Sequence, residues 1–271
     1  MMNGSRILLG VVLAMAAPMR GGAAEPGADA PVPKTYEEAM DLIRGAEAKK
    51  RQAPSRSVGH VDGGSLENPS VLPLDGFGFT IGARRHRGRD LRYGTDELVF
   101  GLAEAAATLA RAQPGAPRLV IGNMGQRGGG AITYSYSHQN GRDVDLAFFV
   151  TDREGRPYEP ADLAVIGSGK TLEGNEEGSG TVCRFDLARN WELVVALLEC
   201  RRFGARVEKL YIWDPLRERL LERGKAWAAE AGEGAAERAR REALVLRAGG
   251  LLSQPGFAGP HDDHLHLRIG E

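Results

Sequence analysis

Histidines gather near the end of this sequence, in the stretch HDDHLHLRI at residues 261–269. If this stretch forms a β-strand, alternate side chains share a face, so His264, His266 and Arg268 project together while Leu and Ile enter the core. Two histidines on one face of a strand provide half of a metal site, because a catalytic zinc ion takes three protein ligands and leaves one position for water. The missing ligand must come from another segment.

That segment is SHQNGRDVD at residues 137–145. His138 lies in a glycine-containing loop, and Asp145, seven positions later, opens an expected strand at residues 144–150. Two histidines and one carboxylate with an open fourth position suit a zinc ion that activates water. The alternative is a hydrogen-bonded polar cluster on the last strand that binds no metal. The second half-site favours the metal.

Other polar residues near these segments have less specific roles. Asp143 and Asp263 are candidates for orienting imidazole rings, although solvent exposure explains them equally well. Gln126 and Arg127 could bind a substrate carboxylate or an oxyanion, but membership of a glycine-rich surface loop at residues 122–130 explains them as simply.

The elements that position these residues follow from capping signals and apolar spacing. Thr35 with Glu38 predicts a helix to about residue 51, and Thr95 begins another that ends before Pro114-Gly115. Further helices are expected at residues 185–199, from Asp214-Pro215 onward and, as a solvated helix, at 226–248. Strands are expected at residues 118–123, 144–150, 207–213 and 264–269. Residues 152–180 are expected to be a long polar insertion.

This order mixes strands and helices without regular alternation, which predicts an α+β domain whose sheet is mainly antiparallel and flanked by helices. The balance of 35 basic and 36 acidic residues gives no electrostatic reason to bind nucleic acid. His60 and His86 are expected to be ordinary surface histidines.

The first 24 residues have the pattern of an export signal. Arg6 precedes an apolar run at residues 7–17, and Gly22 and Ala24 have the small side chains that a signal peptidase requires. The run is shorter than the ~20 apolar residues needed to cross a bilayer. We therefore expect an exported, periplasmic protein with no stable membrane insertion once the signal is removed.

The chain has two cysteines, Cys183 and Cys200, and export suggests a disulfide between them. The helix expected between them would hold its ends roughly 20 Å apart, whereas a disulfide needs Cα atoms within about 7 Å. The pairing requires the chain to fold back along the helix, and the sequence leaves it open.

At these motifs the chain resembles the penicillin-insensitive murein endopeptidases, which are exported zinc peptidases related to lysostaphin, the D-Ala-D-Ala peptidases and the hedgehog domain. The resemblance runs from about residue 55 to 269 and includes RYGT (92–95), GNMGQRGGG (122–130), SHQNGRDVDL (137–146) and FDLARNW (185–191). It implies a hedgehog-like single domain at residues 53–271, preceded by a linker and an N-terminal helix at residues 25–52.

The resemblance also implies roles for individual residues. His138, Asp145 and His266 correspond to the zinc ligands, and His264 and His261 correspond to catalytic residues beside the metal. Ser135 stands where some family members have a further histidine, which leaves any auxiliary contact there in doubt.

The implied activity is zinc-dependent hydrolysis of peptidoglycan peptide cross-links, at D-Ala–diaminopimelate bonds. Two alternatives stay open, namely a non-catalytic zinc-containing domain that binds cell wall and a D,D-carboxypeptidase that trims a terminal residue.

Overall fold

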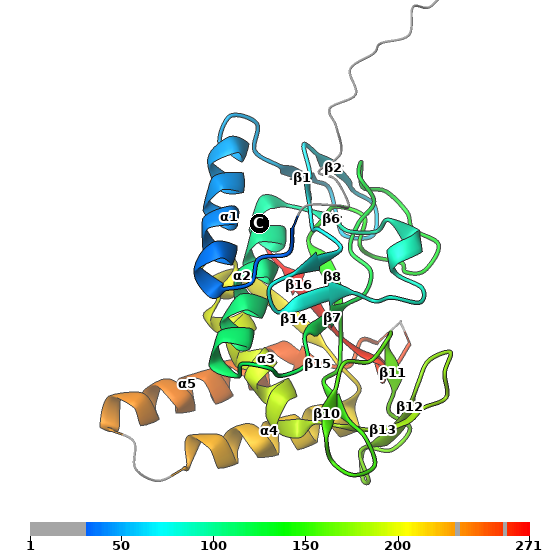
Figure 1. Ribbon diagram of the computed structural model, residues 1–271, viewed down its shortest axis with the longest axis vertical. Helices are drawn as coiled ribbons and strands as arrows, with labels where there is room; N and C mark the ends of the chain where they lie inside the picture. Colours follow the sequence, from blue (N-terminus) through cyan, green and yellow to red (C-terminus); the bar gives the residue numbers. More distant parts are fainter. Residues whose placement is uncertain (1–30, 231–233, 257–258) are drawn as a thin grey trace, which may run out of the picture. The chain divides into compact units, whose positions relative to one another are not determined.

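The computed structural model describes residues 31–230, 234–256 and 259–271 (Figure 1). The predicted export signal at residues 1–24 lies outside these residues, as does most of the predicted linker. Among the residues described, no helix is long and apolar enough to cross a membrane.

A seven-stranded sheet forms the centre of the fold, in the order β15-β14-β16-β8-β7-β5-β4. Its strands are β15 (Leu252–Ser253), β14 (Val207–Tyr211), β16 (His264–Ile269), β8 (Asp143–Ala147), β7 (Leu119–Ile121), β5 (Phe79–Ile81) and β4 (Asp75–Gly76). Neighbouring strands are antiparallel except for the pairs β14–β15 and β5–β7. The predicted α+β class with a mainly antiparallel sheet is therefore confirmed.

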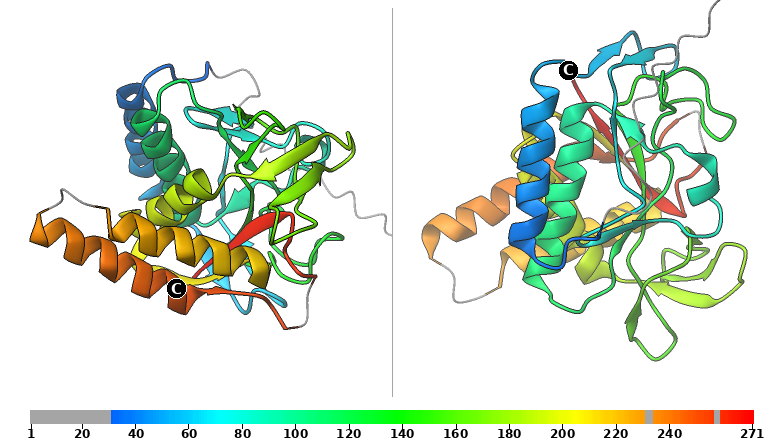
Figure 2. Two further views of the ribbon diagram at one scale, coloured as in Figure 1. Left: turned by 90° about the horizontal axis from the view of Figure 1, so that it is seen from below. Right: turned by 45° about the horizontal axis from the view of Figure 1, so that its top comes forward.

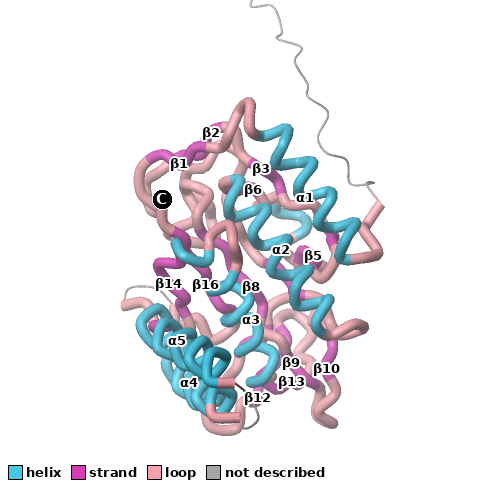
Figure 3. Tube along the Cα trace, turned by 90° about the vertical axis from the view of Figure 1, so that its left-hand side faces the viewer, coloured by secondary structure: helices cyan, strands magenta, loops and turns pink. Residues whose placement is uncertain are grey.

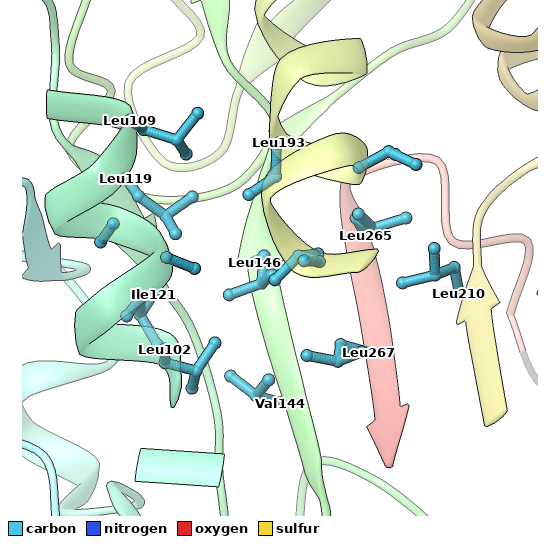
Figure 4. Packing of buried hydrophobic residues seen from close by; sticks show 14 of the residues in the cluster. Leu102, Leu109, Leu119, Ile121, Val144, Leu146, Leu193, Leu210, Leu265 and Leu267 are labelled. Atoms are coloured by element: carbon cyan, nitrogen blue, oxygen red, sulfur yellow. The ribbon is translucent and has the colours of Figure 1, made fainter. Parts of the chain in front are cut away.

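The core lies between this sheet and two helices, α2 (Asp96–Ala112) and α3 (Leu187–Glu199). Leu265 and Leu267 of β16 are buried there, as the period of two in the strand predicted. Figure 4 shows them beside Leu146 of β8 and close to the leucines of both helices. This packing turns the odd-numbered side chains of β16 inward and leaves the even-numbered ones for the opposite face.

Capping residues set the helix starts as predicted. Thr35 accepts a hydrogen bond from the backbone of Glu38 at the start of α1 (Tyr36–Lys50), and Thr95 caps α2 in the same way. Figure 3 shows α1 beside α2, and α4 (Asp214–Ala228) beside α5 (Ala235–Leu251).

The helix predicted at residues 226–248 is wrong in its bounds. The helix that opens at Asp214 ends at Ala228, and a separate helix begins at Ala235 and runs back alongside it (Figure 2). Leu244 and Ala248 of α5 are buried, so this helix is not solvated on every side.

The segment at residues 152–180, expected to be a long polar insertion, contains three strands of a second sheet that the sequence did not predict. The order of this five-stranded sheet is β10-β9-β13-β12-β11. Its strands are β10 (Pro157–Tyr158), β9 (Val150–Thr151), β13 (Val182–Phe185), β12 (Glu173–Glu176) and β11 (Ala164–Val165). The strand predicted at residues 144–150 divides accordingly, because β8 ends at Ala147 and Val150 begins β9 in the other sheet.

Two separate two-stranded sheets complete the described strands, and two 3-10 helices lie in the connections. These elements are β1 (Arg56–Val58) with β2 (Ser65–Glu67), β3 (Ser70–Val71) with β6 (Tyr93–Gly94), η1 (Arg87–Arg89) and η2 (Gly204–Arg206).

Cys183 and Cys200 are buried free thiols, so the suggested disulfide is not formed. Cys183 lies in β13, whereas Cys200 follows the last residue of α3 and its Sγ lies 3.5 Å from the carbonyl oxygen of Gly101 in α2. The helix keeps them at opposite ends, as its length predicted.

Candidate metal centre

Strand pairing places two of the predicted ligands opposite each other. β8 and β16 are antiparallel neighbours, and their register sets His266 against Asp145 and Arg268 against Asp143. Directly opposed residues on one sheet face have Cβ atoms about 4.5–5.5 Å apart. The backbone ladder therefore fixes the separation of these side chains.

The third predicted ligand, His138, reaches this face from the loop that precedes β8. Its backbone has φ of 69°, in the left-handed region, where histidine is enriched among non-glycine residues. Its amide N–H donates to Asp143 Oδ2 at 3.1 Å, which ties the loop to the strand that it enters. An unusual backbone conformation held in this way is typical of functional positions.

These side chains converge on one carboxylate oxygen, Asp145 Oδ1. His138 Nε2 lies 3.2 Å from it and His266 Nδ1 lies 3.1 Å from it. All three residues are buried, and their candidate ligand atoms lie within 4.8 Å of one another. Two imidazole nitrogens and one carboxylate oxygen at this spacing form a donor set that suits a zinc ion.

The hydrogen bonding of His138 supports a metal more strongly than proximity does. The side chain is 0% exposed, its Nε2 lies 3.2 Å from Asp145 Oδ1 without the geometry of a hydrogen bond, and its Nδ1 has no hydrogen-bond partner among the residues that the structure describes. Buried polar atoms are nearly always paired, because leaving one unpaired costs about 1–3 kcal/mol. A metal ion bound at Nε2 would satisfy one of these atoms.

His264 lies beside this group and shares the same carboxylate. Its Nε2 is 3.2 Å from Asp145 Oδ1 and its Nδ1 is 2.6 Å from Asp263 Oδ1. Burial lowers the pKa of this imidazole, but the charges and hydrogen bonds of Asp145 and Asp263 outweigh burial and raise the pKa to about 10 in the metal-free protein.

The two aspartates of β8 are held ionised by their neighbours. Burial raises the pKa of the Asp145 carboxyl, but the charges of His138 and His264 lower it well below its ordinary range. Burial also raises the pKa of the Asp143 carboxyl, but contacts with His266 and Arg268 outweigh burial and lower that pKa. Both carboxyl groups are therefore ionised, and an ionised carboxylate is a ligand for a cation.

His261 stands at the edge of the site. Its ring centroid lies 4.7 Å from that of His264 and 5.5 Å from that of His266, and its backbone φ is 57°. Its Nδ1 lies 2.8 Å from the carbonyl oxygen of Gly259. Burial and then the charge of His264 lower the pKa of His261 to about 4. His261, His264 and His266 form a second group of potential ligand atoms that shares His266 with the first.

Of the four supporting residues that the sequence suggested, two contact the site and two do not. Asp143 is fully buried and Asp263 pairs with His264, so both contact imidazoles or their backbone rather than solvent alone. The amide of Gln126 donates within its own loop to the carbonyl oxygens of Gly129 and Ala131, and Arg127 is exposed.

Ser135, at the position where some relatives have histidine, lies 3.5 Å from Ser137 through the two hydroxyl oxygens. Its hydroxyl also accepts a hydrogen bond from the backbone N–H of Ser137.

The expectation for His86 is wrong, whereas His60 is exposed as predicted. His86 is buried, and its Nδ1 lies 2.5 Å from Asp162 Oδ1. The arginines around it in the sequence indicated a surface segment. Asp162 lies two residues before β11, so the contact between Asp162 and His86 depends on the folding of the second sheet.

Two residues at the site escaped the sequence analysis. Tyr211 of β14 pairs with His266 in the sheet, and their ring centroids are 5.5 Å apart. Asn123 donates from Nδ2 to Asp145 Oδ2 at 3.1 Å. Asn123 is a polar residue that closes an expected apolar strand, and this was the one signal that could have drawn attention to it.

Two buried histidines and a buried carboxylate on one face of the mainly antiparallel sheet define a site that can bind a metal ion. The family model of the penicillin-insensitive murein endopeptidases matches residues 57–166. This match confirms the resemblance to that family and includes His138 and Asp145, while β16 lies beyond it. No curated protein matches the chain.

Proposed function

We propose that the protein is an exported zinc-dependent endopeptidase that hydrolyses peptide cross-links of peptidoglycan, at D-Ala–diaminopimelate bonds. The family match supports a peptidase that acts on murein. The observation that carries the zinc dependence is the convergence of His138 Nε2 and His266 Nδ1 on the buried Asp145 Oδ1, at 3.2 and 3.1 Å. The export pattern of residues 1–24 supports a periplasmic location.

In this proposal His138, Asp145 and His266 hold the zinc ion. A bound zinc ion lowers the pKa of a coordinated water to about 7 and polarises a carbonyl oxygen. The protein contributes a rigid donor set, since two of the three residues are fixed by strand pairing. Asp143 is not one of the proposed ligands. Its carboxylate accepts hydrogen bonds from the backbone N–H of His138 and from Arg268 Nε, which fixes the loop that carries His138.

His264 is proposed as the residue that transfers protons and stabilises the developing charge at the scissile bond. Its Nδ1 is anchored by Asp263, so Nε2 is the atom directed into the site. A cation bound at Asp145 would oppose the protonated state of His264, because it would neutralise one of the carboxylates that raise its pKa. The neutral ring could accept a proton from water, and the protonated ring could stabilise an oxyanion or protonate the leaving amine.

The test is cleavage of purified cross-linked muropeptides by the mature protein, with and without a chelator and with and without penicillin. We expect cleavage that chelation abolishes, that zinc restores and that penicillin leaves unchanged. His138→Ala should be inactive, and His60→Ala, which alters an exposed histidine outside the metal centre, should be active.

The products distinguish the alternatives. Release of single D-alanine without loss of cross-links would identify a D,D-carboxypeptidase. Zinc binding without hydrolysis of any muropeptide would identify a binding domain. Cleavage that persists in chelator would contradict the zinc mechanism itself.

A further inference from the structure

The two oxygens of Asp145 have different surroundings. Oδ1 faces the imidazoles of His138, His264 and His266 at 3.1–3.2 Å. Oδ2 accepts a hydrogen bond of 3.1 Å from the side-chain amide of Asn123. The carboxylate is therefore oriented with one oxygen toward the candidate metal position and the other held away from it.

Asn123 is itself held in one orientation. Its Oδ1 accepts a hydrogen bond of 3.0 Å from Arg89 Nη1, which leaves Nδ2 to donate to Asp145. The backbone reinforces this pairing, because the amide of Asp145 donates to the Asn123 carbonyl oxygen at 2.9 Å and the amide of Gly122 donates to the Asp145 carbonyl oxygen at 2.8 Å. Asn123 is buried, so water competes little for these bonds.

Arg89 connects this pair to the loop that carries His138. Its guanidinium carbon lies 3.6 Å from the ring centroid of Tyr134, a cation–π contact, and Tyr134 stands four residues before His138. One arginine therefore contacts the residue that orients Asp145 and the segment that leads to His138.

We propose that Asn123, oriented by Arg89, is a positioning residue that holds Asp145 to a single metal-binding oxygen. A carboxylate free to rotate could offer both oxygens to the ion and fill the position needed by water. Fixing Oδ2 keeps that position open and preorganises the donor set. This inference rests on the proposed zinc site, and it assigns a role to Asn123 and Arg89 that is separate from ligation.

The decisive variant is Asn123→Asp in the full chain. The introduced carboxylate keeps an acceptor for Arg89 but replaces the donor facing Asp145 Oδ2 with a negative charge. Loss of an outer hydrogen-bond partner weakens metal binding by about 10–100-fold, and we expect a loss of zinc affinity of that size in competition with a chromogenic chelator. Arg89→Gln, which is milder for folding, should show a smaller loss.

The coordination mode is read from the visible absorption of Co²⁺ substituted for zinc, measured at full occupancy. Wild type should show the intense bands of a low-coordinate site, and Asn123→Asp should show weaker bands because a second carboxylate oxygen raises the coordination number. The matched control is Asn190→Asp, a buried asparagine whose Nδ2 also donates to neighbouring oxygens, here the backbone carbonyls of Phe149 and Asp186.

The outcomes separate this inference from the proposed function. If wild type binds neither zinc nor Co²⁺, the proposed metal centre fails and the inference fails with it. If wild type binds both ions and the Asn123→Asp and Arg89→Gln variants match its affinity and spectrum, the positioning role alone is overturned. Equal losses in Asn190→Asp would likewise overturn it, because the effect would then be one of general stability. Should Asn123→Asp fail to fold, Arg89→Gln decides by the same measurements.

Discussion

The left-handed backbone of His138 allows its metal-binding role to be separated from its contribution to folding. When no metal is bound, the Nδ1 of its buried ring has no hydrogen-bond partner within the described residues, which costs about 1–3 kcal/mol. A φ of 69° costs a non-glycine residue a further ~1–2 kcal/mol. Replacing His138 with glycine removes both costs, and together they offset the ~2–5 kcal/mol typical of lost packing. We therefore expect His138→Gly to match wild type within about 1 kcal/mol when a chelator is present.

Zinc should then distinguish the two proteins. Free zinc at 100 times its dissociation constant stabilises a folded protein by about 2.7 kcal/mol. At roughly 2–4 °C per kcal/mol for a domain of 150–250 residues, the wild-type Tm should rise by about 5–11 °C. The variant lacks a ligand, so its Tm should not change.

Differential scanning calorimetry in chelator and in excess zinc measures both quantities, with His60→Ala as a control that should respond like wild type. A zinc-dependent rise in Tm for His138→Gly would show that His138 is not a ligand. A Tm more than ~4 °C below wild type in chelator, which corresponds to more than about 1 kcal/mol, would show that the imidazole supports the fold without metal.

Other perturbations test the remaining parts of the site and the core. His264→Ala should retain zinc by metal analysis yet lose roughly 10²–10⁴-fold in muropeptide cleavage, the usual size of a general acid–base contribution; loss of zinc would make His264 a ligand instead. Because the folded-state pKa of His264 is raised to about 10 from 6.5, its contribution to metal-free stability is complete below pH 6.5 and is lost as pH rises through about 10. Denaturant unfolding in chelator should therefore show wild type losing stability relative to His264→Gln over that range, and parallel curves would contradict the pairing. Leu267→Ala, at a fully buried position of β16, should destabilise by about 2–5 kcal/mol in the same assay, and a loss below 1 kcal/mol would mean that β16 is not part of the packed core.

The parts of the fold that sequence predicted are those set by local signals. Thr95 caps α2 because its hydroxyl satisfies an amide three residues away, and alternation in β16 follows from the two faces of any strand. The combination of His138 and Asp145 with the two histidines of the last strand came from the ligand number of zinc, and the resemblance assigned His266 as the ligand and His264 as the catalytic residue. None of these needs knowledge of distant contacts.

Apart from the bounds of the helix predicted at residues 226–248, the failures involve distant contacts. The strands within residues 152–180 are two to four residues long and are joined by turns, so only the short run at residues 163–166 is apolar. His86 looks exposed in sequence because its burial depends on Asp162 in that undetected sheet. Asn123 belongs to no recognisable motif. Its proposed role depends on hydrogen bonds with Arg89 and with Asp145, which lie 34 and 22 residues away in the sequence.

The position of β16 has a consequence for how the chain matures. His266 and Asp145 are 121 residues apart in sequence, and β16 lies between β14 and β8 in the sheet. A folding intermediate in which β16 has not yet docked leaves both neighbours with unpaired edges, which are prone to aggregation and to proteolysis. The donor set is equally incomplete in that intermediate, because His266 arrives with the strand. Completion of the sheet and assembly of the ligand set are thus a single event, so partly folded chains carry no complete ligand set.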